Sequence, residues 1–198
     1  MTSGYSDEEW LGISFHEAGH AVAGMLASRC MLGDYRGTKQ VMLGRLHQLP
    51  SPLGNGRVAF CEYDPSILDF APAQSAPNRT RSRIYVARAI WRSICCLAGP
   101  YAELRHYGVS TKHAGEWTPE LRGGSDQDFE FARYHYKFAD GMKRPGLMKI
   151  HEQTYRLVDY NFQVIERVAA ALFDAGHLTN GQLVELAGLQ GDRMLSAA

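Results

Sequence analysis

The sequence predicts a mostly α-helical domain of the α+β class that carries a small β-hairpin or sheet. Apolar residues recur at helical spacing over most of the chain, whereas a strand-like pattern occurs only between about residues 39 and 63. With 198 residues and a hydrophobic content of 45%, the chain can bury the core of one domain, which we expect to span residues 1–198.

The first helix is expected at about residues 7–29. Ser6 and Glu9 have the spacing of a capping box, in which the serine side chain caps the helix and the glutamate reaches back to the serine backbone. Acidic residues also fill the first turn, where the helix dipole favours negative charge. The apolar contacts of this helix are expected from Trp10, Ile13, Val22, Met25 and Leu26.

Two strands are expected within the small sheet at about residues 39–63. The apolar runs Val41–Leu43 and Val58–Phe60 lie on either side of a segment rich in proline and glycine, which is typical of a long turn. The following segment, from Asp64 to Arg79, contains three prolines and is expected to be a loop.

The remaining residues, 81–190, are expected to be helical. A helix is predicted from Arg81 to His106, with a kink at Pro100 or a break at Gly99, because proline lacks the N–H that an interior helical position donates.

Three more helices follow in the predicted order. Ser125 is expected to cap a helix that ends near Ala139. A long amphipathic helix should follow Pro145 and end near Gly176. A short helix should then begin at Thr179, with Gln182 three residues on as its capping partner.

Composition argues against several kinds of partner and location. Twenty-one basic residues balance twenty-one acidic ones, so we expect no nucleic acid partner. No run approaches the roughly 18–20 consecutive apolar residues of a membrane span, and the polar N-terminus does not look like a signal peptide. We therefore expect a cytoplasmic protein in which all four cysteines are reduced packing residues: Cys30, Cys61, Cys95 and Cys96.

The chemistry of the first helix lies in its segment His16-Glu17-Ala18-Gly19-His20. Two histidines four residues apart project from one face of a helix, which makes this a zincin-like metal helix able to supply two ligands of a tetrahedral Zn²⁺ site. Glu17 can then act as the catalytic base, taking a proton from a zinc-bound water and passing it to the leaving amine. Gly19 is unfavourable inside a helix by about 1 kcal/mol, which a close approach of another backbone or of a substrate would explain.

A catalytic zinc site needs a third protein ligand and leaves the fourth position to water. No histidine lies between Leu26 and Cys30, and no glutamate about twenty residues on lies in an obvious helix, so a more distant ligand is required. Spacing alone leaves nine candidates open: His47, His106, His113, Asp126, Asp128, Glu130, His135, His151 and His177.

Four segments resemble the peptidase domain of FtsH-type proteases, the membrane-bound, ATP-dependent zinc metalloproteases. The segment Phe15–Ala21 is similar to that family's metal helix. Leu97–Leu104 resembles its second helix, which usually reads Leu-Gly-Gly-Arg-Ala-Ala-Glu. Gly124–Glu130 resembles its Gly-Ala-Ser-Asn-Asp segment, and Ala170–Thr179 resembles its last helix and the turn that follows.

The resemblance implies a role for two further carboxylates. The third zinc ligand of the family falls on Asp128, with Asp126 as the reserve. Asp128 is equally well placed as the capping-box partner of Ser125, which is its competing structural role. Glu103 matches a family glutamate near the metal helix and is a candidate for orienting a ligating imidazole from the second shell of the site; its competing role is an ordinary surface carboxylate.

The resemblance also implies a substrate and an assembly. The family holds peptides as an added strand on a sheet edge, a role open here to Val58–Cys61 or Val41–Leu43. This chain lacks the phosphate-binding loop of the family's ATPase, so we expect a free-standing zinc endopeptidase that hydrolyses short or unfolded peptides. Because the family is hexameric, a homo-oligomer is possible.

Two alternatives to a peptidase stay open. One is a proteolytically inactive regulatory or adaptor protein that binds a peptide or partner through the same zinc domain. The other is a structural zinc site whose fourth position is closed, for instance by His113.

Overall fold

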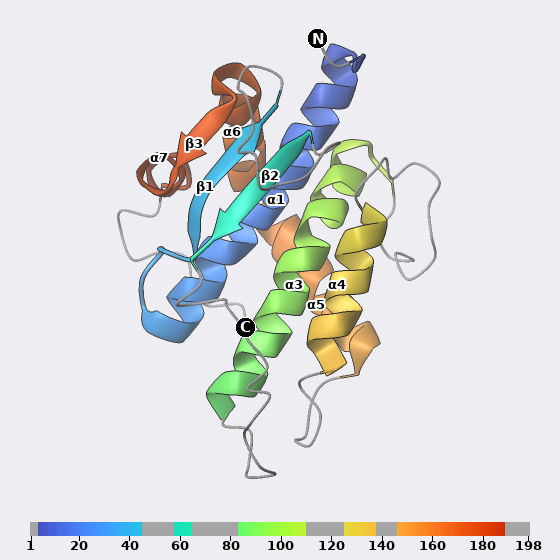
Figure 1. Ribbon diagram of the computed structural model, residues 1–198, viewed down its shortest axis with the longest axis vertical. Coiled ribbons are helices and arrows are strands. Elements are labelled where there is room, and N and C mark those ends of the chain that lie inside the picture. The colour runs from blue at the N-terminus through green and yellow to red at the C-terminus, as the bar shows by residue number, and fades with distance from the viewer. Residues whose placement is uncertain (1–3, 45–57, 65–82, 110–124, 138–145, 189–198) are drawn as a thin grey trace.

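The computed structural model describes residues 4–44, 58–64, 83–109, 125–137 and 146–188. Within these ranges the chain forms six helices and a three-stranded antiparallel sheet, which confirms the predicted mostly α-helical, α+β class (Figure 1). The elements in chain order are α1 Asp7–Leu32, β1 Thr38–Leu43, β2 Ala59–Tyr63, α3 Arg83–His106, α4 Ser125–Lys137, α5 Leu147–Tyr160, α6 Phe162–Ala175, β3 His177–Thr179 and α7 Asn180–Leu186.

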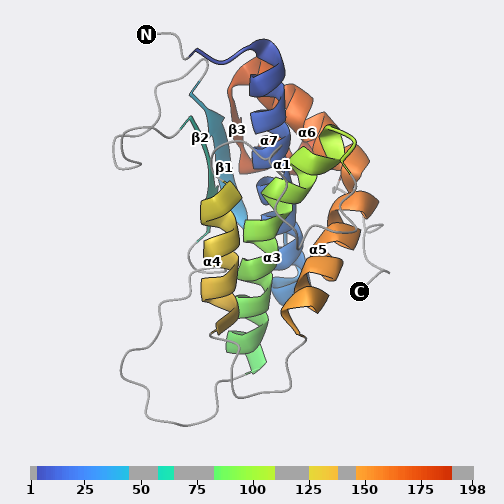
Figure 2. The ribbon, with the colours of Figure 1, turned by 90° about the vertical axis from the view of Figure 1, so that its right-hand side faces the viewer.

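Helix α1 is the central element of the fold. The predicted capping box is present, because the Ser6 side chain accepts from the Glu9 backbone while the Glu9 side chain binds the Ser6 backbone. Gly33 ends the helix in the left-handed conformation, with φ of 79°. The sheet covers one side of α1 while α3 and α6 cover others (Figure 2), so nearly every residue from Ser14 to Ser28 is buried.

The sheet has the order β2-β1-β3, so β1 lies in the middle and β2 forms an edge among the described strands. Val41 and Leu43 of β1 are fully buried and face the helices, as alternation along a strand requires. Val41 pairs with Cys61 of β2 on one side and with Leu178 of β3 on the other. The two predicted strands are confirmed, whereas β3 was not predicted.

The helices correct two predictions. Helix α3 continues through Pro100, so the break at Gly99 is wrong. The single long helix after Pro145 is also wrong, because the chain forms α5 and α6 with Asn161 between them. The Asn161 side-chain amide donates to the Leu157 carbonyl at 2.8 Å, the same oxygen that its own backbone N–H binds at 3.1 Å.

The last predicted helix is confirmed. Thr179 precedes α7 and forms the expected capping box with Gln182. No helix in the described ranges combines the length and the apolar character that crossing a membrane requires. All four cysteines are free thiols; Cys95 and Cys96 are buried, Cys61 is partly buried and Cys30 is exposed. The expected loop at residues 64–79 and the turn between the first two strands lie outside the described residues, apart from their ends.

Candidate metal centre

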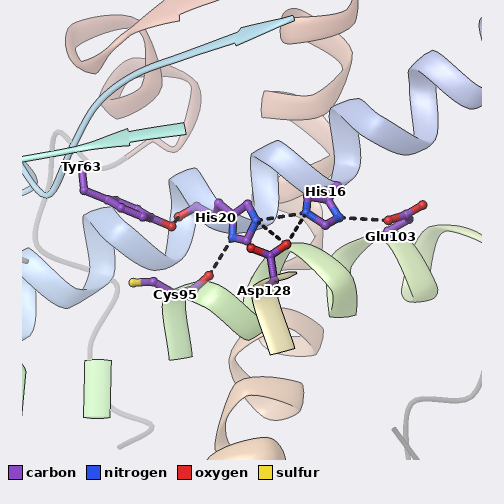
Figure 3. A network of polar contacts seen from close by, with 6 residues as sticks. All are labelled: His16, His20, Tyr63, Cys95, Glu103 and Asp128. Carbon is purple, nitrogen blue, oxygen red and sulfur yellow. Dashed lines mark hydrogen bonds and ion pairs between the residues drawn. The ribbon is translucent and has the colours of Figure 1, made fainter. Parts of the chain in front are cut away.

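Three side chains from two helices meet beside the middle of α1. His16 and His20 project from α1 one turn apart, and Asp128 reaches them from the first turn of α4 (Figure 3). The Asp128 Oδ2 atom lies 3.0 Å from His16 Nε2 and 3.4 Å from His20 Nε2, and the two Nε2 atoms are 3.1 Å apart. The structure therefore brings together the three residues that the sequence and the family resemblance proposed as ligands.

Each histidine is held by the nitrogen that does not face this centre. The Nδ1–H of His16 donates to Glu103 Oε2 at 2.9 Å, and the Nδ1–H of His20 donates to the backbone carbonyl of Cys95 at 2.7 Å (Figure 3). Both acceptors belong to α3. Because Nδ1 carries the proton in each neutral ring, both Nε2 atoms direct a lone pair at the centre.

This donor set fits a zinc ion. A tetrahedral ion bound at about 2.0–2.1 Å holds its ligand atoms about 3.3–3.4 Å from one another. The three separations of 3.0, 3.1 and 3.4 Å differ from that spacing by a few tenths of an ångström. Two imidazole lone pairs and a carboxylate oxygen repel one another unless a cation or proton lies between them. The geometry thus suits a positive ion bound by two nitrogens and one oxygen.

The electrostatics of the metal-free triad point the same way. Burial lowers the pKa of His16, but hydrogen bonds to Asp128 and Glu103 outweigh burial and raise the pKa to about 10. Burial raises the pKa of Asp128, yet its electrostatic interaction with His20 and the hydrogen bond to His16 leave that pKa well below its ordinary value. The centre therefore attracts positive charge, and without a metal it holds a proton.

Two glycines allow α1 and α3 to approach each other here. A Cβ atom at Gly19 would lie 2.7 Å from Ala102 Cβ and closer still to the Ala98 carbonyl of α3. A Cβ atom at Gly99 would lie 2.6 Å from His20 Cε1. The close approach of another backbone that Gly19 predicted is confirmed, and Gly99 makes room for a ligand ring.

Glu17 is buried on α1 and is not one of the three converging residues, as expected of a base that is not a ligand. Burial raises the pKa of the Cys61 thiol, and the negative charge of Glu17 raises it further. Glu17 thus lies within electrostatic reach of Cys61 on β2.

The other third-ligand candidates in the described ranges lie outside the cluster. His106 stacks on Phe15, His151 binds Tyr101, and His177 binds Gln40. Asp126 and Glu130 are exposed, and His135 has its pKa lowered to about 4 by burial and by Arg92. His47 and His113 lie outside the described residues, and so does the proposal that His113 closes the fourth position.

The capping role of Asp128 is not the arrangement observed. Ser125 is the first residue of α4, and its buried hydroxyl has no hydrogen-bond partner among the described residues. The Asp128 carboxylate binds the histidines instead.

Sequence reasoning missed three features of the site. The Cys95 carbonyl carries no sequence signal, because any residue offers a backbone oxygen. Gly99, next to Pro100, indicates by itself only a weak point in the helix. Tyr63 of β2, whose hydroxyl donates to the His20 carbonyl at 3.4 Å, carries only a strand signal in the sequence.

Neither family models nor curated proteins identify a relative of this chain. No family model matches the sequence, and no curated protein matches it. The likeness to FtsH-type peptidases therefore remains one of short motifs.

Proposed function

We propose that this protein is a zinc-dependent endopeptidase that hydrolyses short or unfolded peptides. The observation that carries the proposal is the convergence of His16 Nε2, His20 Nε2 and Asp128 Oδ2, with both Nδ1 atoms anchored to α3. Two histidines and one carboxylate are a ligand set of catalytic zinc sites, which leave one coordination position open. Zinc supplies Lewis-acid polarisation of a carbonyl and lowers the pKa of a water that it holds.

The chain's own residues supply the proton transfers. Glu17 follows the first ligand directly and is buried within electrostatic reach of β2, and its carboxylate can take a proton from the attacking water. The same carboxylate can return that proton to the leaving amine. Glu103 acts as a positioning residue, because it fixes the ring of His16 through Nδ1.

The substrate fits the outer edge of β2. Strand β2 pairs only with β1 among the described strands, so its other edge can pair with an extended peptide through backbone hydrogen bonds. Such pairing needs an unfolded segment and sets few demands on its sequence. Of the two strands considered, β2 is therefore favoured over β1, whose two edges are both paired.

The proposal also includes a cellular compartment and an oligomeric state. Four free thiols suit a reducing compartment such as the cytoplasm. A homo-oligomer remains part of the proposal on the family resemblance alone. The adaptor alternative uses the same zinc site and the same strand edge but no hydrolysis.

A comparison of wild type with Glu17→Gln tests the function. Both proteins should contain about one zinc per chain by elemental analysis, because Glu17 is not a ligand. Wild type should cut an unstructured protein without ATP, and Glu17→Gln should be slower by ~100-fold or more. Equal residual activity in the two would identify a contaminating protease. A zinc-loaded wild type that binds peptides but cuts none would establish the adaptor alternative.

A further inference from the structure

The ring of Tyr63 lies between the end of β2 and the metal helix α1. Tyr63 is the last residue of β2, and its ring lies on α1 where Gly24 leaves space, since a Cβ atom at Gly24 would be 2.7 Å from Tyr63 Cε1. Its hydroxyl points to the His20 carbonyl (Figure 3). The strand therefore ends directly beside the metal helix.

Arg92 of α3 stacks on this ring. Its guanidinium carbon lies 4.6 Å from the Tyr63 ring centroid, and the side chain is partly exposed. Cys96 lies one turn further along the same face of α3. Burial raises the pKa of the Cys96 thiol, Arg92 lowers it and Asp128 raises it, so one thiol lies within reach of both charges. Arg92 thus lies at the end of β2, and its charge reaches the same thiol as that of the ligand Asp128.

The positive charge of Arg92 has no carboxylate to balance it in the described part of the chain. Other arginines do form such pairs: Arg36 with Asp34, Arg105 with Asp159, and Arg156 with Glu152. No ion pair of Arg92 occurs among the described residues. Burial and Arg92 hold the pKa of His135, on α4, at about 4, so that ring is neutral at pH 7 and adds no competing charge. A guanidinium placed over an aromatic ring still has N–H groups that can bind a carboxylate.

The spacing along β2 gives the position of such a carboxylate on a bound peptide. Cys61, which feels the charge of Glu17, and Tyr63, which carries Arg92, lie two residues apart on the same face of the strand. Two residues of strand span about 7 Å. A peptide paired with the edge of β2 advances by the same two residues between the base and the guanidinium.

We propose that Arg92 is a specificity-determining residue that binds a carboxylate of the peptide two residues from the cleaved bond. This inference rests on the proposed peptidase function and narrows its substrates to peptides that are acidic at one position. The carboxylate comes either from an aspartate or glutamate side chain or from the C-terminus of a peptide that ends there. The direction in which the peptide pairs with β2 decides whether this carboxylate lies before or after the cleaved bond.

Matched peptides test the inference. One set is amidated and carries Glu or Gln two residues before or two residues after the cleaved bond. A second set ends two residues after that bond, with either a free carboxylate or an amide. For the preferred position, the kcat/KM ratio of carboxylate over amide peptide should be ~5 to 10 in wild type. The effect should lie mainly in KM.

Variants of two arginines on α3 complete the test. Arg92→Gln should bring the ratio to about 1, whereas Arg92→Lys should keep part of it because the charge remains. Arg105→Gln is the matched control, since Arg105 also stacks on an aromatic ring, at 5.1 Å from the Phe162 centroid, and should keep the wild-type ratio. A merely structural role of Arg92 predicts an equal effect on acidic and amide peptides.

The outcomes separate the two claims. If wild type cuts acidic and amide peptides equally well in both sets, the Arg92 inference is overturned and the peptidase function stands. If zinc-loaded wild type cuts neither, the peptidase function is overturned, and peptide Kd values decide the role of Arg92. If wild type binds the carboxylate peptide more tightly than the amide peptide, and Arg92→Gln loses this difference, the role of Arg92 is supported. Equal Kd values of the two peptides in wild type would overturn that role.

Discussion

The imidazole of His20 occupies the space that a side chain at position 99 would fill. Gly99 on α3 faces this ring so closely that a Cβ atom there would lie 2.6 Å from His20 Cε1. One turn back on the same helix, the Cys95 carbonyl holds His20 Nδ1. Helix α3 therefore both orients the ligand and leaves room for it.

Gly99→Ala should weaken zinc binding by roughly 10- to 100-fold, because the added methyl displaces the ring from its anchored position. Competition with a chromophoric chelator measures the affinity. Gly181→Ala is the matched control, since no atom lies within 4 Å of a Cβ atom at Gly181. Wild-type zinc affinity in Gly99→Ala would show that His20 tolerates displacement and would refute this account of the site.

Asp128→Asn should weaken zinc binding sharply, because a neutral amide does not replace the carboxylate charge. Asp126→Asn should bind zinc about as well as wild type, since Asp126 is exposed and lies outside the cluster. Zinc content after dialysis gives a direct readout for both proteins. The reverse result would place the ligand at Asp126 and contradict the geometry.

His16→Ala and His20→Ala should each abolish stoichiometric zinc binding, because only two of the three protein ligands remain and two are too few to hold the ion. Elemental analysis of the purified variants checks this. His106→Ala serves as control, since that ring stacks on Phe15 and is not part of the cluster. Full zinc occupancy in both ligand variants would disprove the metal centre.

Glu103→Gln should lower zinc affinity by ~10- to 100-fold, because the carboxylate that fixes His16 Nδ1–H is replaced by a weaker acceptor. Calorimetric titration measures the change. If Glu103 were only a surface carboxylate, its replacement would leave zinc affinity unchanged. Glu103 is, however, only 3% exposed. Glu152→Gln, on the exposed side of α5, provides the comparison and should not alter zinc binding.

Raising the pH should destabilise the metal-free protein. The pKa of His16 is about 10 in the folded state against an ordinary 6.5, so the folded protein holds a proton that the unfolded chain releases. This contribution to stability is complete below about pH 6.5 and is lost as the pH approaches 10. Over that window the free energy of unfolding should fall by up to about 1.4 kcal/mol per pH unit.

Urea unfolding in the presence of a chelator, at pH 7 to about pH 9.5, measures this slope. His16→Gln should remove most of it, since the titrating ring is gone. Zinc affinity should rise over the same range, because the metal must displace the proton. A free energy of unfolding that is independent of pH in wild type would contradict the charged triad.

The sequence was sufficient for the features that depend on local chemistry. The capping box of Ser6 and Glu9, the metal helix and the first two strands follow from spacing and turn residues alone. Motif resemblance placed Asp128 and Glu103 beside the histidines, although they are 112 and 87 residues from His16. Sequence spacing alone could not identify Asp128 as the third ligand, because the packing of α4 on α3 determines which carboxylate lies beside the two histidines.

The features that could not be predicted depend on tertiary contacts. Strand β3 is three residues long and exists only because β1 offers an edge to pair with. Helix α3 continues through Pro100 while packed along α1, where tertiary contacts outweigh the missing hydrogen bond. The division at Asn161 had a weak local signal, since asparagine side chains often bind nearby carbonyls, but such residues also occur inside uninterrupted helices.

The origin of Asp128 on a helix far along the chain affects what happens during synthesis. His16 and His20 leave the ribosome early, whereas Asp128 follows His16 by 112 residues and reaches the site only after α3 has formed a surface for α4. Under the proposed function, the emerging chain is itself an unfolded peptide and therefore a possible substrate. Its centre lacks a ligand until α4 has been made and has packed on α3, so a shorter nascent chain is protected from its own hydrolysis and from cutting its neighbours.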